Sequence, residues 1–473
     1  MPTKKQIAEV EAIIDADKGL MTEALAELIR IPSKTSPALP GMPYGKQCAD
    51  ALAVALKRAE SLGFSTNNCN NILGWAEFGE GTELLAVLAH LDVVPEGDGW
   101  TADPFGAEIV SGRMYGRGTQ DDKGPAIAAL FAMSAIKKAG LKTDRRVRLI
   151  LGCDEENGSS DMAYYAQNCE LPGLCFSPDA EYPVVNGEKG MLRVSVRGSY
   201  PVNDKLPRVL SASGGDRINI VAPKSTAVIA GMDYSTLSGI CSAISKQTGV
   251  TISLSEELFE SVSAIRVSIA GKGAHAATPE EGNSANTVLF ALLAALPLAD
   301  GAISAQLAEL IRLFPHGDTR GYAAKIAVKD DVSGELTCNP GLFELGESGF
   351  TAKLDIRYPI TADGGSIFAA LKTVSSLVDI SLSADVPPHY VPPESSLVKG
   401  LLSAYTDVTG KEGYCFSIGG GTYARVFDGG VSFGCLFPGG EDRMHKADEY
   451  ISIDELVLNA KIISRAIINL ACS

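Results

Sequence analysis

One apolar segment constrains the fold of this chain more than any other. Residues 84–89 are all aliphatic, and His90-Leu91-Asp92 follows them directly. An uninterrupted apolar run of this length is typical of a strand that is buried on both faces of a parallel sheet. Ligands of such sheets bind at the carboxyl ends of the strands, where His90 and Asp92 would lie. An isolated His-x-Asp pair is nevertheless more often a strand end that meets water, because short motifs have many false matches.

Two further segments repeat this pattern and favour an α/β fold. Val147–Gly152 is mostly apolar and precedes Asp154-Glu155-Glu156, and Leu174–Ser177 precedes Pro178-Asp179. A helical pattern at 125–138 lies between the first strand and the second. Strands that alternate with helices predict a mostly parallel sheet with helices on both faces. Three strand ends would then present acidic or imidazole groups at one edge.

The residues beyond about 185 show a different pattern. Met191–Arg197 and Phe350–Tyr358 alternate apolar and polar side chains, which indicates strands with one exposed face. Helices on one side of such strands would make a separate α+β domain. The α/β pattern returns after the proline-rich residues 387–393. We therefore predict a discontinuous α/β domain at 1–187 and 387–473, with a large α+β domain inserted at 188–386.

The composition excludes several classes of partner. The formal net charge is -16 at pH 7, whereas nucleic acids and anionic membranes attract clusters of Lys and Arg. The sequence contains no run of about 18 apolar residues that would span a bilayer. Its ten cysteines are scattered without a C-x-x-C pair, which is typical of reduced thiols. Because the first residues also lack the apolar segment of a signal peptide, we expect a cytoplasmic protein without nucleic-acid or membrane partners.

Each acidic or imidazole group has a simpler explanation when taken alone. Glu155-Glu156 could form the acidic first turn of a helix, and Asp121-Asp122 could cap the helix near Pro125. Asp179 could be a turn residue, and His445 a surface or core residue. Taken together, their positions favour a shared site over these separate explanations, because groups at several strand ends can converge on one crevice. A mixed set of His and carboxylate ligands suits Zn most readily, with Mn or Co as alternatives, and a pair of ions needs a bridging carboxylate.

Five motifs occur in an order that resembles a known family. They are His90-x-Asp92, Gly116-Arg117-Gly118-x-x-Asp121-x-Lys123-Gly124, Glu155-Glu156, Pro178-Asp179, and His445 with Glu449 four residues later. Their types and order resemble the M20 family of di-zinc metallopeptidases over nearly the whole chain. Within that family, the bacterial dipeptidase V branch is similar at Asp355-Ile356-Arg357-Tyr358-Pro359 and Gly419-Gly420-Gly421-Thr422-Tyr423.

The resemblance implies a centre that holds two divalent cations. Asp121 would bridge both ions, because the bridging Asp of the family lies two residues before Lys-Gly. His90 and Asp179 would complete one site. Glu156 and His445 would complete the other. The family also has a cis peptide after the bridging Asp, which predicts a cis bond between Asp121 and Asp122.

The resemblance also implies catalytic and substrate-binding residues. Glu155 would be the general base, Asp92 would orient His90, and His275 of the inserted lid would approach the scissile carbonyl. Arg357 would clamp the terminal carboxylate of the substrate, a task that a bidentate fork suits, although a salt-bridged surface Arg is the alternative. Weaker matches place Asn219, Gly421 and Thr422 in contact with substrate. The remaining histidines, His316 and His389, match no motif and are expected to be structural.

These roles predict a metal-dependent dipeptidase, in which a metal-bridged water attacks the amide bond of a small peptide. N-acyl amino acid deacylases and carboxypeptidases of the same family are the enzymatic alternatives. The non-enzymatic alternative is a metal-binding or structural protein on a degenerate peptidase scaffold, and the presence of Glu155 beside all five ligand candidates argues against it. The long insert favours the dipeptidase and a monomer, because one large lid would do what a partner's lid does in dimeric relatives.

Overall fold

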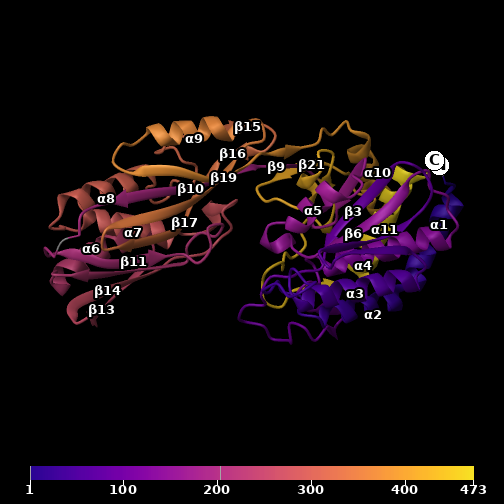
Figure 1. The fold of residues 1–473 in the computed structure, drawn as a ribbon, viewed down its shortest axis with the longest axis horizontal. Helices are drawn as coiled ribbons and strands as arrows, with labels where there is room; N and C mark the ends of the chain where they lie inside the picture. Colours follow the sequence, from indigo (N-terminus) through magenta and orange to yellow (C-terminus); the bar gives the residue numbers. More distant parts are fainter. Residues whose placement is uncertain (1, 203, 473) are drawn as a thin grey trace. The chain divides into compact units, whose positions relative to one another are not determined.

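The computed structural model describes residues 2–202 and 204–472. Its contacts divide the chain into two compact units (Figure 1). Unit 1 comprises Met1–Asn186, Tyr390–Phe416 and Gly421–Ser473, and unit 2 comprises Gly187–His389 and Ser417–Gly420. Each unit has its own hydrophobic core and is described separately.

Unit 1 is built on a mixed sheet whose centre is parallel. The strand order is β1-β2-β6-β3-β7-β22-β9-β20, and β21 pairs with β9. The strands β6, β3, β7 and β22 run parallel to one another. At one side β2 pairs antiparallel with both β6 and β1, and at the other β9 pairs antiparallel with β22. Their bounds are β1 Ser65–Cys69, β2 Leu73–Phe78, β3 Leu84–His90, β6 Arg146–Gly152, β7 Leu174–Ser177, β9 Val184–Glu188, β20 His389–Tyr390, β21 Cys415–Ile418 and β22 Val431–Ser432.

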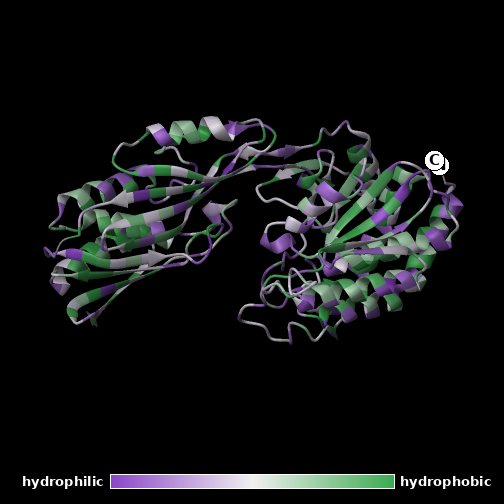
Figure 2. Cartoon of the chain, viewed as in Figure 1, coloured by the Kyte–Doolittle hydropathy of each residue, from purple (hydrophilic) through white to green (hydrophobic). Residues whose placement is uncertain are grey.

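Helices cover both faces of this sheet, which explains why β3 is apolar throughout. Every residue of β3 is buried, with Leu85, Val87 and Ala89 in the main core and Ala86 and Leu88 in a smaller core on the opposite face. Figure 2 shows the apolar character of β3 and β6. The helices are α1 Lys4–Ala16, α2 Lys18–Ile29, α3 Lys46–Ser61, α4 Lys123–Lys138, α5 Ser160–Asn168, α10 Ser396–Thr409 and α11 Ile453–Ala471, with the short 3-10 helices η1 Glu155–Asn157 and η3 Tyr423–Val426.

The amino-terminal segment differs from the sequence expectation. The amphipathic residues 7–31, followed by Pro32, predict one helix up to Ile31. The structure instead has two helices that meet at Asp17. The Asp17 carboxylate forms an ion pair with Lys138 at the end of α4, 2.5 Å away. Asp has low helix propensity and favours helix ends, so this tertiary contact coincides with a local weak point. The helix near Pro125 also begins earlier than expected, at Lys123.

Unit 2 is an antiparallel sheet with helices packed on one face. The strand order is β13-β14-β12-β11-β17-β18-β10-β19, and each neighbouring pair is antiparallel. The strands are β10 Gly190–Ser199, β11 Arg208–Gly214, β12 Lys224–Ala230, β13 Thr251–Phe259, β14 Val262–Ala270, β17 Thr337–Gly346, β18 Gly349–Tyr358 and β19 Asp379–Val386. The helices α6 Tyr234–Thr248, α7 Ala285–Ala295, α8 Gly301–Leu313 and α9 Gly364–Thr373 supply the rest of its core.

The predicted fold class, a mostly parallel α/β unit with a large α+β insertion, is confirmed. Short strands complete the structure: β4 Glu108–Val110, β5 Arg113–Tyr115 and β24 Tyr450–Ser452 in one small sheet, β8 Ala180–Glu181 with β23 Cys435–Leu436, and β15 Lys329–Asp330 with β16 Gly334–Glu335. Within residues 2–202 and 204–472, no helix is long and apolar enough to cross a membrane.

Candidate metal centre

The carboxyl ends of three parallel strands bring polar side chains together in unit 1. β3 lies between β6 and β7. His90 is the last residue of β3, η1 with Glu155 and Glu156 follows β6, and Asp179 follows β7. The edge at which these strands end is where ligands bind in sheets of this kind. Glu155 and Glu156 form a single 3-10 turn rather than the first turn of an α-helix.

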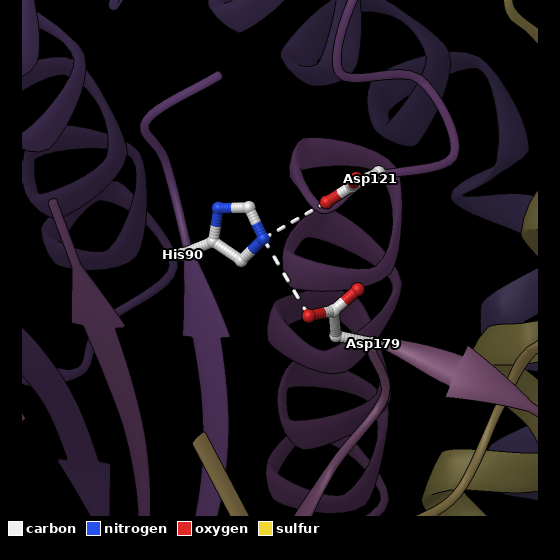
Figure 3. Close-up of side chains that lie close together, drawn as sticks. All are labelled: His90, Asp121 and Asp179. Carbon is white, nitrogen blue, oxygen red and sulfur yellow. Dashed lines mark ion pairs between the residues drawn. The ribbon is translucent and has the colours of Figure 1, made fainter. Parts of the chain in front are cut away.

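The first candidate site contains His90, Asp121 and Asp179, which point toward one another (Figure 3). Nε2 of His90 lies 2.9 Å from Oδ1 of Asp121 and 3.6 Å from Oδ2 of Asp179. This nitrogen is buried and makes no well-aligned hydrogen bond within the described part of the chain. A buried ring nitrogen flanked by two carboxylates is the arrangement expected of a metal ligand.

The second candidate site contains Asp121, Glu156 and His445. Nε2 of His445 lies 2.9 Å from Oδ2 of Asp121 and 3.0 Å from Oε1 of Glu156. Asp121 therefore directs one carboxylate oxygen toward each histidine. His445 itself has a positive φ of 62°, a left-handed conformation that few non-glycine residues adopt.

The loop that carries Asp121 is fixed by its neighbours. The predicted cis peptide between Asp121 and Asp122 is present. Oδ2 of Asp122 accepts the backbone N–H of His90 at 3.0 Å. Lys123 is fully buried, and its Nζ donates to the carbonyl oxygens of Leu28 and Ile31 at 3.0 and 2.7 Å. These contacts tie the loop to β3 and to the end of α2.

Asp92 contacts both His90 and the turn that carries the two glutamates. Nδ1 of His90 lies 3.0 Å from the carbonyl oxygen of Asp92 and 3.5 Å from its Oδ1. The same carboxylate accepts the backbone N–H groups of Glu155 at 3.2 Å and Glu156 at 3.1 Å. A partner on Nδ1 leaves Nε2 free to act as a ligand, because the two ring nitrogens then have separate roles.

The charges of the cluster are poorly balanced within the protein. Burial, together with the charge of nearby carboxylates, raises the pKa of Glu155, Glu156 and Asp179. Burial also acts against ionisation of Asp121, but His445 and His90 outweigh it and hold the pKa of Asp121 well below its usual range. These oxygen and imidazole donors are of the kind that bind divalent cations. Bound cations would offset the excess negative charge of the cluster.

In unit 2, His275 and Asn219 lie on adjacent segments. Ile220 and His275 form an isolated antiparallel bridge, and the carbonyl oxygen of Asn219 accepts the N–H of Ala276 at 2.9 Å. His275 is exposed and Asn219 is half-buried. The buried side chain of Asn339 on β17 donates to the carbonyls of Ile218 and Ile220, both at 3.1 Å. The predicted catalytic residue His275 and the predicted substrate-binding residue Asn219 therefore lie on neighbouring backbone segments of unit 2.

Arg357 is buried on β18 and its guanidinium is already partly engaged. Its Nε and Nη2 donate to the two oxygens of Asp355 at 2.7 and 2.9 Å, and its Nη1 donates to the carbonyl of Gly419 at 2.8 Å. Only 3% of the residue is exposed. The alternative of a salt-bridged Arg on the surface is wrong in one respect, since the ion pair is present but buried.

The other two predicted substrate-binding residues lie in unit 1. Gly421 is exposed, and a Cβ built on it would meet Nη1 of Arg425 at 2.4 Å. Thr422 is buried, and its Oγ1 accepts the N–H of Ala424 at 3.2 Å and lies 2.8 Å from Oγ of Ser432. The Thr422 side chain thus caps η3.

Three residues around the site were assigned no function from the sequence, although Tyr423 and Glu449 belong to motifs that it contains. Asp161 on α5 accepts the backbone N–H of Cys153 at 2.6 Å, and Tyr423 donates to the same carboxylate. Glu449 accepts hydrogen bonds from the loop of Asp121. Its place four residues after His445 is the one signal in the sequence that singles it out.

Comparisons with known proteins agree with this geometry. A model of the peptidase family M20/M25/M40 matches residues 86–469. The chain is 37% identical over 450 residues to the putative dipeptidase YtjP of Bacillus subtilis, an alignment that covers 94% of this chain and 96% of that protein. It is 34% identical over 474 residues to the Beta-Ala-Xaa dipeptidase of Lactobacillus delbrueckii subsp. lactis, with 97% of each covered.

The crystal structure of human carnosine dipeptidase 1 has the same fold, with a TM-score of 0.57 and 16% identity over 99% of both chains. The family model and the two bacterial relatives confirm the family that the motifs predict. This chain belongs to the peptidase family M20/M25/M40.

Proposed function

We propose that this chain is a metal-dependent dipeptidase. The observation that carries the proposal is the position of Asp121, whose two carboxylate oxygens each lie 2.9 Å from a different histidine. A carboxylate shared in this way is the feature that a pair of neighbouring cations requires. The relatives named as dipeptidases, which align over nearly the whole chain, support the same activity.

We assign five ligands to the two cations. His90, Asp121 and Asp179 would hold one ion, and Asp121, Glu156 and His445 the other. Zn suits this mixture of imidazole and carboxylate donors most readily, with Mn or Co as alternatives. When bound, such a pair of ions supplies a water of lowered pKa and a positive charge near the scissile carbonyl.

Glu155 is the residue that we assign to proton transfer. It lies next to Glu156 on η1, and its backbone is fixed by Asp92. In the metal-free chain, burial raises the pKa of Glu155, and a carboxylate placed beside the candidate ligands can act as a general base once bound cations offset the nearby negative charge. Glu155 would take a proton from the attacking water and deliver it to the leaving amine nitrogen.

Substrate recognition is assigned mainly to the inserted residues 188–386, which would act as a lid over the domain formed by 1–187 and 387–473. His275 would donate to the developing oxyanion. Arg357 would attract the carboxylate end of the peptide, with Asn219, Gly421 and Thr422 as further contacts. A lid that supplies such groups assembles the site only around a bound substrate. Because the chain has its own large lid, we expect a monomer.

The ten cysteines support a reducing compartment. All of them are free, and seven are buried. Free thiols in this number are typical of cytoplasmic proteins, so we propose that the enzyme acts in the cytoplasm on small peptides.

A substrate panel tests the proposal. Purified protein with Zn, Mn or Co is assayed with dipeptides, tripeptides and N-acyl amino acids of matched side chains. The expected result is the highest kcat/KM for dipeptides, loss of activity after chelation, and recovery when the divalent cation is restored. A preference for N-acyl amino acids would instead indicate a deacylase. Activity that survives complete removal of metal would contradict the proposed centre.

A further inference from the structure

Glu449 receives three backbone hydrogen bonds from the loop that ends in Asp121. Its Oε1 accepts the N–H of Gly118 at 3.0 Å, of Gln120 at 2.8 Å and of Asp121 at 3.3 Å. Its own carbonyl oxygen accepts the N–H of Gly116 at 2.9 Å. Successive N–H groups that point at one acceptor form a binding site for an anion, and here the anion is a side chain of the protein.

The charge of Glu449 is compensated by Arg117 of the same loop. Nη1 of Arg117 lies 2.5 Å from Oε2 of Glu449. Both residues are buried, since Arg117 is 1% exposed and Glu449 is 0% exposed. Nη2 of Arg117 donates to the carbonyl of Glu96 at 3.1 Å, and the guanidinium lies 5.4 Å from the centre of the Trp100 ring. The carboxylate is therefore held in one orientation from both sides.

The segment that carries Glu449 also carries His445. Nε2 of His445 lies 2.9 Å from Oδ2 of Asp121. Gln120 adds two contacts to the same segment, since its Nε2 donates to the carbonyl of Glu441 at 3.2 Å and its Oε1 accepts the N–H of Arg443 at 2.9 Å. One stretch of chain thus contacts Asp121 at the carboxylate and at the backbone.

We propose that Glu449 is a positioning residue for the metal centre, which fixes the backbone of the Asp121 loop so that the Asp121 carboxylate faces both His90 and His445. The inference rests on the metal centre of the proposed function. Loss of the carboxylate would leave three buried N–H groups and the Arg117 charge without their partner, so the loop would relax. Groups that orient ligands from outside the metal's own contacts typically contribute about tenfold to a hundredfold in affinity.

Glu449→Gln tests this role with the smallest change of shape. The amide keeps one acceptor oxygen but removes the charge. Dissociation constants for Zn are measured by competition with a chelator dye, and the Co-loaded protein is examined by visible absorption, which reports ligand geometry. We expect Zn binding to weaken about tenfold to a hundredfold and the Co spectrum to change. Glu449→Asp, which keeps the charge, should retain part of the affinity.

Glu309→Gln is the matched control. Glu309 is also buried, at 9% exposure, and pairs with Arg312 through both carboxylate oxygens at 2.6 Å, but it lies on α8 of unit 2. It should leave Zn affinity unchanged even where it lowers thermal stability. If Glu449→Gln does not fold, the same measurements are made on Glu449→Asp. A Glu449→Asp variant with the Zn affinity and the Co spectrum of the wild type would then overturn the inference.

The outcomes separate this inference from the proposed function. Wild-type protein that binds two ions while Glu449→Gln binds them equally tightly would refute the positioning role and leave the centre intact. Wild-type protein that binds no ion would refute both. Weaker binding in Glu449→Gln, partial recovery in Glu449→Asp and no change in Glu309→Gln would support the role of Glu449.

Discussion

Oδ2 of Asp92 accepts the backbone N–H of Glu156 at 3.1 Å. This bond joins the segment after β3 to the turn after β6, so the positions of two candidate ligands, His90 and Glu156, depend on one carboxylate. Asp92→Ala should therefore weaken Zn binding and lower kcat/KM by about tenfold to a hundredfold, the usual effect of removing a group that orients ligands. Equilibrium dialysis and steady-state kinetics measure the two quantities. Unchanged values for both would show that the turn keeps its position without Asp92.

Glu155→Gln should separate metal binding from turnover. The amide cannot accept the proton of the attacking water, so kcat should fall by about a hundredfold to ten-thousandfold. Two ions per chain should remain, as measured by elemental analysis. A variant that keeps wild-type kcat would remove Glu155 from the role of general base.

His445→Ala should remove one ion from the centre. The substitution deletes the nitrogen that lies 2.9 Å from Asp121 and 3.0 Å from Glu156, so the metal content should fall from two ions per chain toward one. His316→Ala is the matched control, because His316 contacts Thr287 in unit 2 and should keep both ions. Equal metal content in the two variants would exclude His445 as a ligand.

Arg357→Lys should reduce selectivity for a free carboxyl terminus. A Lys ammonium cannot hold Asp355 through two nitrogens, as Arg357 does, and also attract a substrate carboxylate. A lost charge-assisted hydrogen bond to that carboxylate costs about 1.5–3 kcal/mol. KM for a dipeptide should rise by about tenfold or more, while KM for the same dipeptide with an amidated carboxyl end should change little. Parallel increases for both substrates would argue that Arg357 only supports the structure.

Asp161 predicts a pH dependence of stability. Burial is the largest cause that raises the pKa of Asp161, from 3.8 to about 6. The folded state then binds this proton more tightly than the unfolded state, so the group's contribution to the free energy of unfolding falls as pH rises from about 4 to about 6. Two pKa units correspond to about 3 kcal/mol.

Asp161→Asn removes this dependence. In the metal-free protein, the free energy of unfolding of the variant relative to the wild type should increase by up to about 3 kcal/mol between pH 4 and pH 7. Urea denaturation at the two pH values measures the difference, and any lost hydrogen bonds affect both values alike. A difference independent of pH would contradict the raised pKa.

The sequence predicts the helices and strands whose apolar pattern reflects which of their faces are buried. β3 and β10 were predictable because apolar patterns reflect burial on two faces or one. Parallel strands end at the same edge of a sheet, so His90, Glu156 and Asp179, which lie at the ends of three such strands, could be expected near one another.

Other features depend on contacts that no local pattern encodes. The break at Asp17 coincides with an ion pair to Lys138, far along the chain. The hydrogen bonds of Asp161 and Glu449 go to backbone N–H groups, and every residue except proline has such a group. Arg357 pairs with Asp355, two residues away on the same strand face, but the pattern of an alternating strand did not indicate that this face is buried.

The position of β22 sets the order in which the protein can be completed. Val431 and Ser432 pair with β7 on one side, and Ser432 pairs with β9 on the other, although more than two hundred residues of chain separate them from these partners. During synthesis, the place between β7 and β9 therefore stays empty until β22 leaves the ribosome, and His445 emerges later still. A nascent chain consequently cannot bring the five candidate ligands together until the segment that carries β22 and His445 has been synthesised.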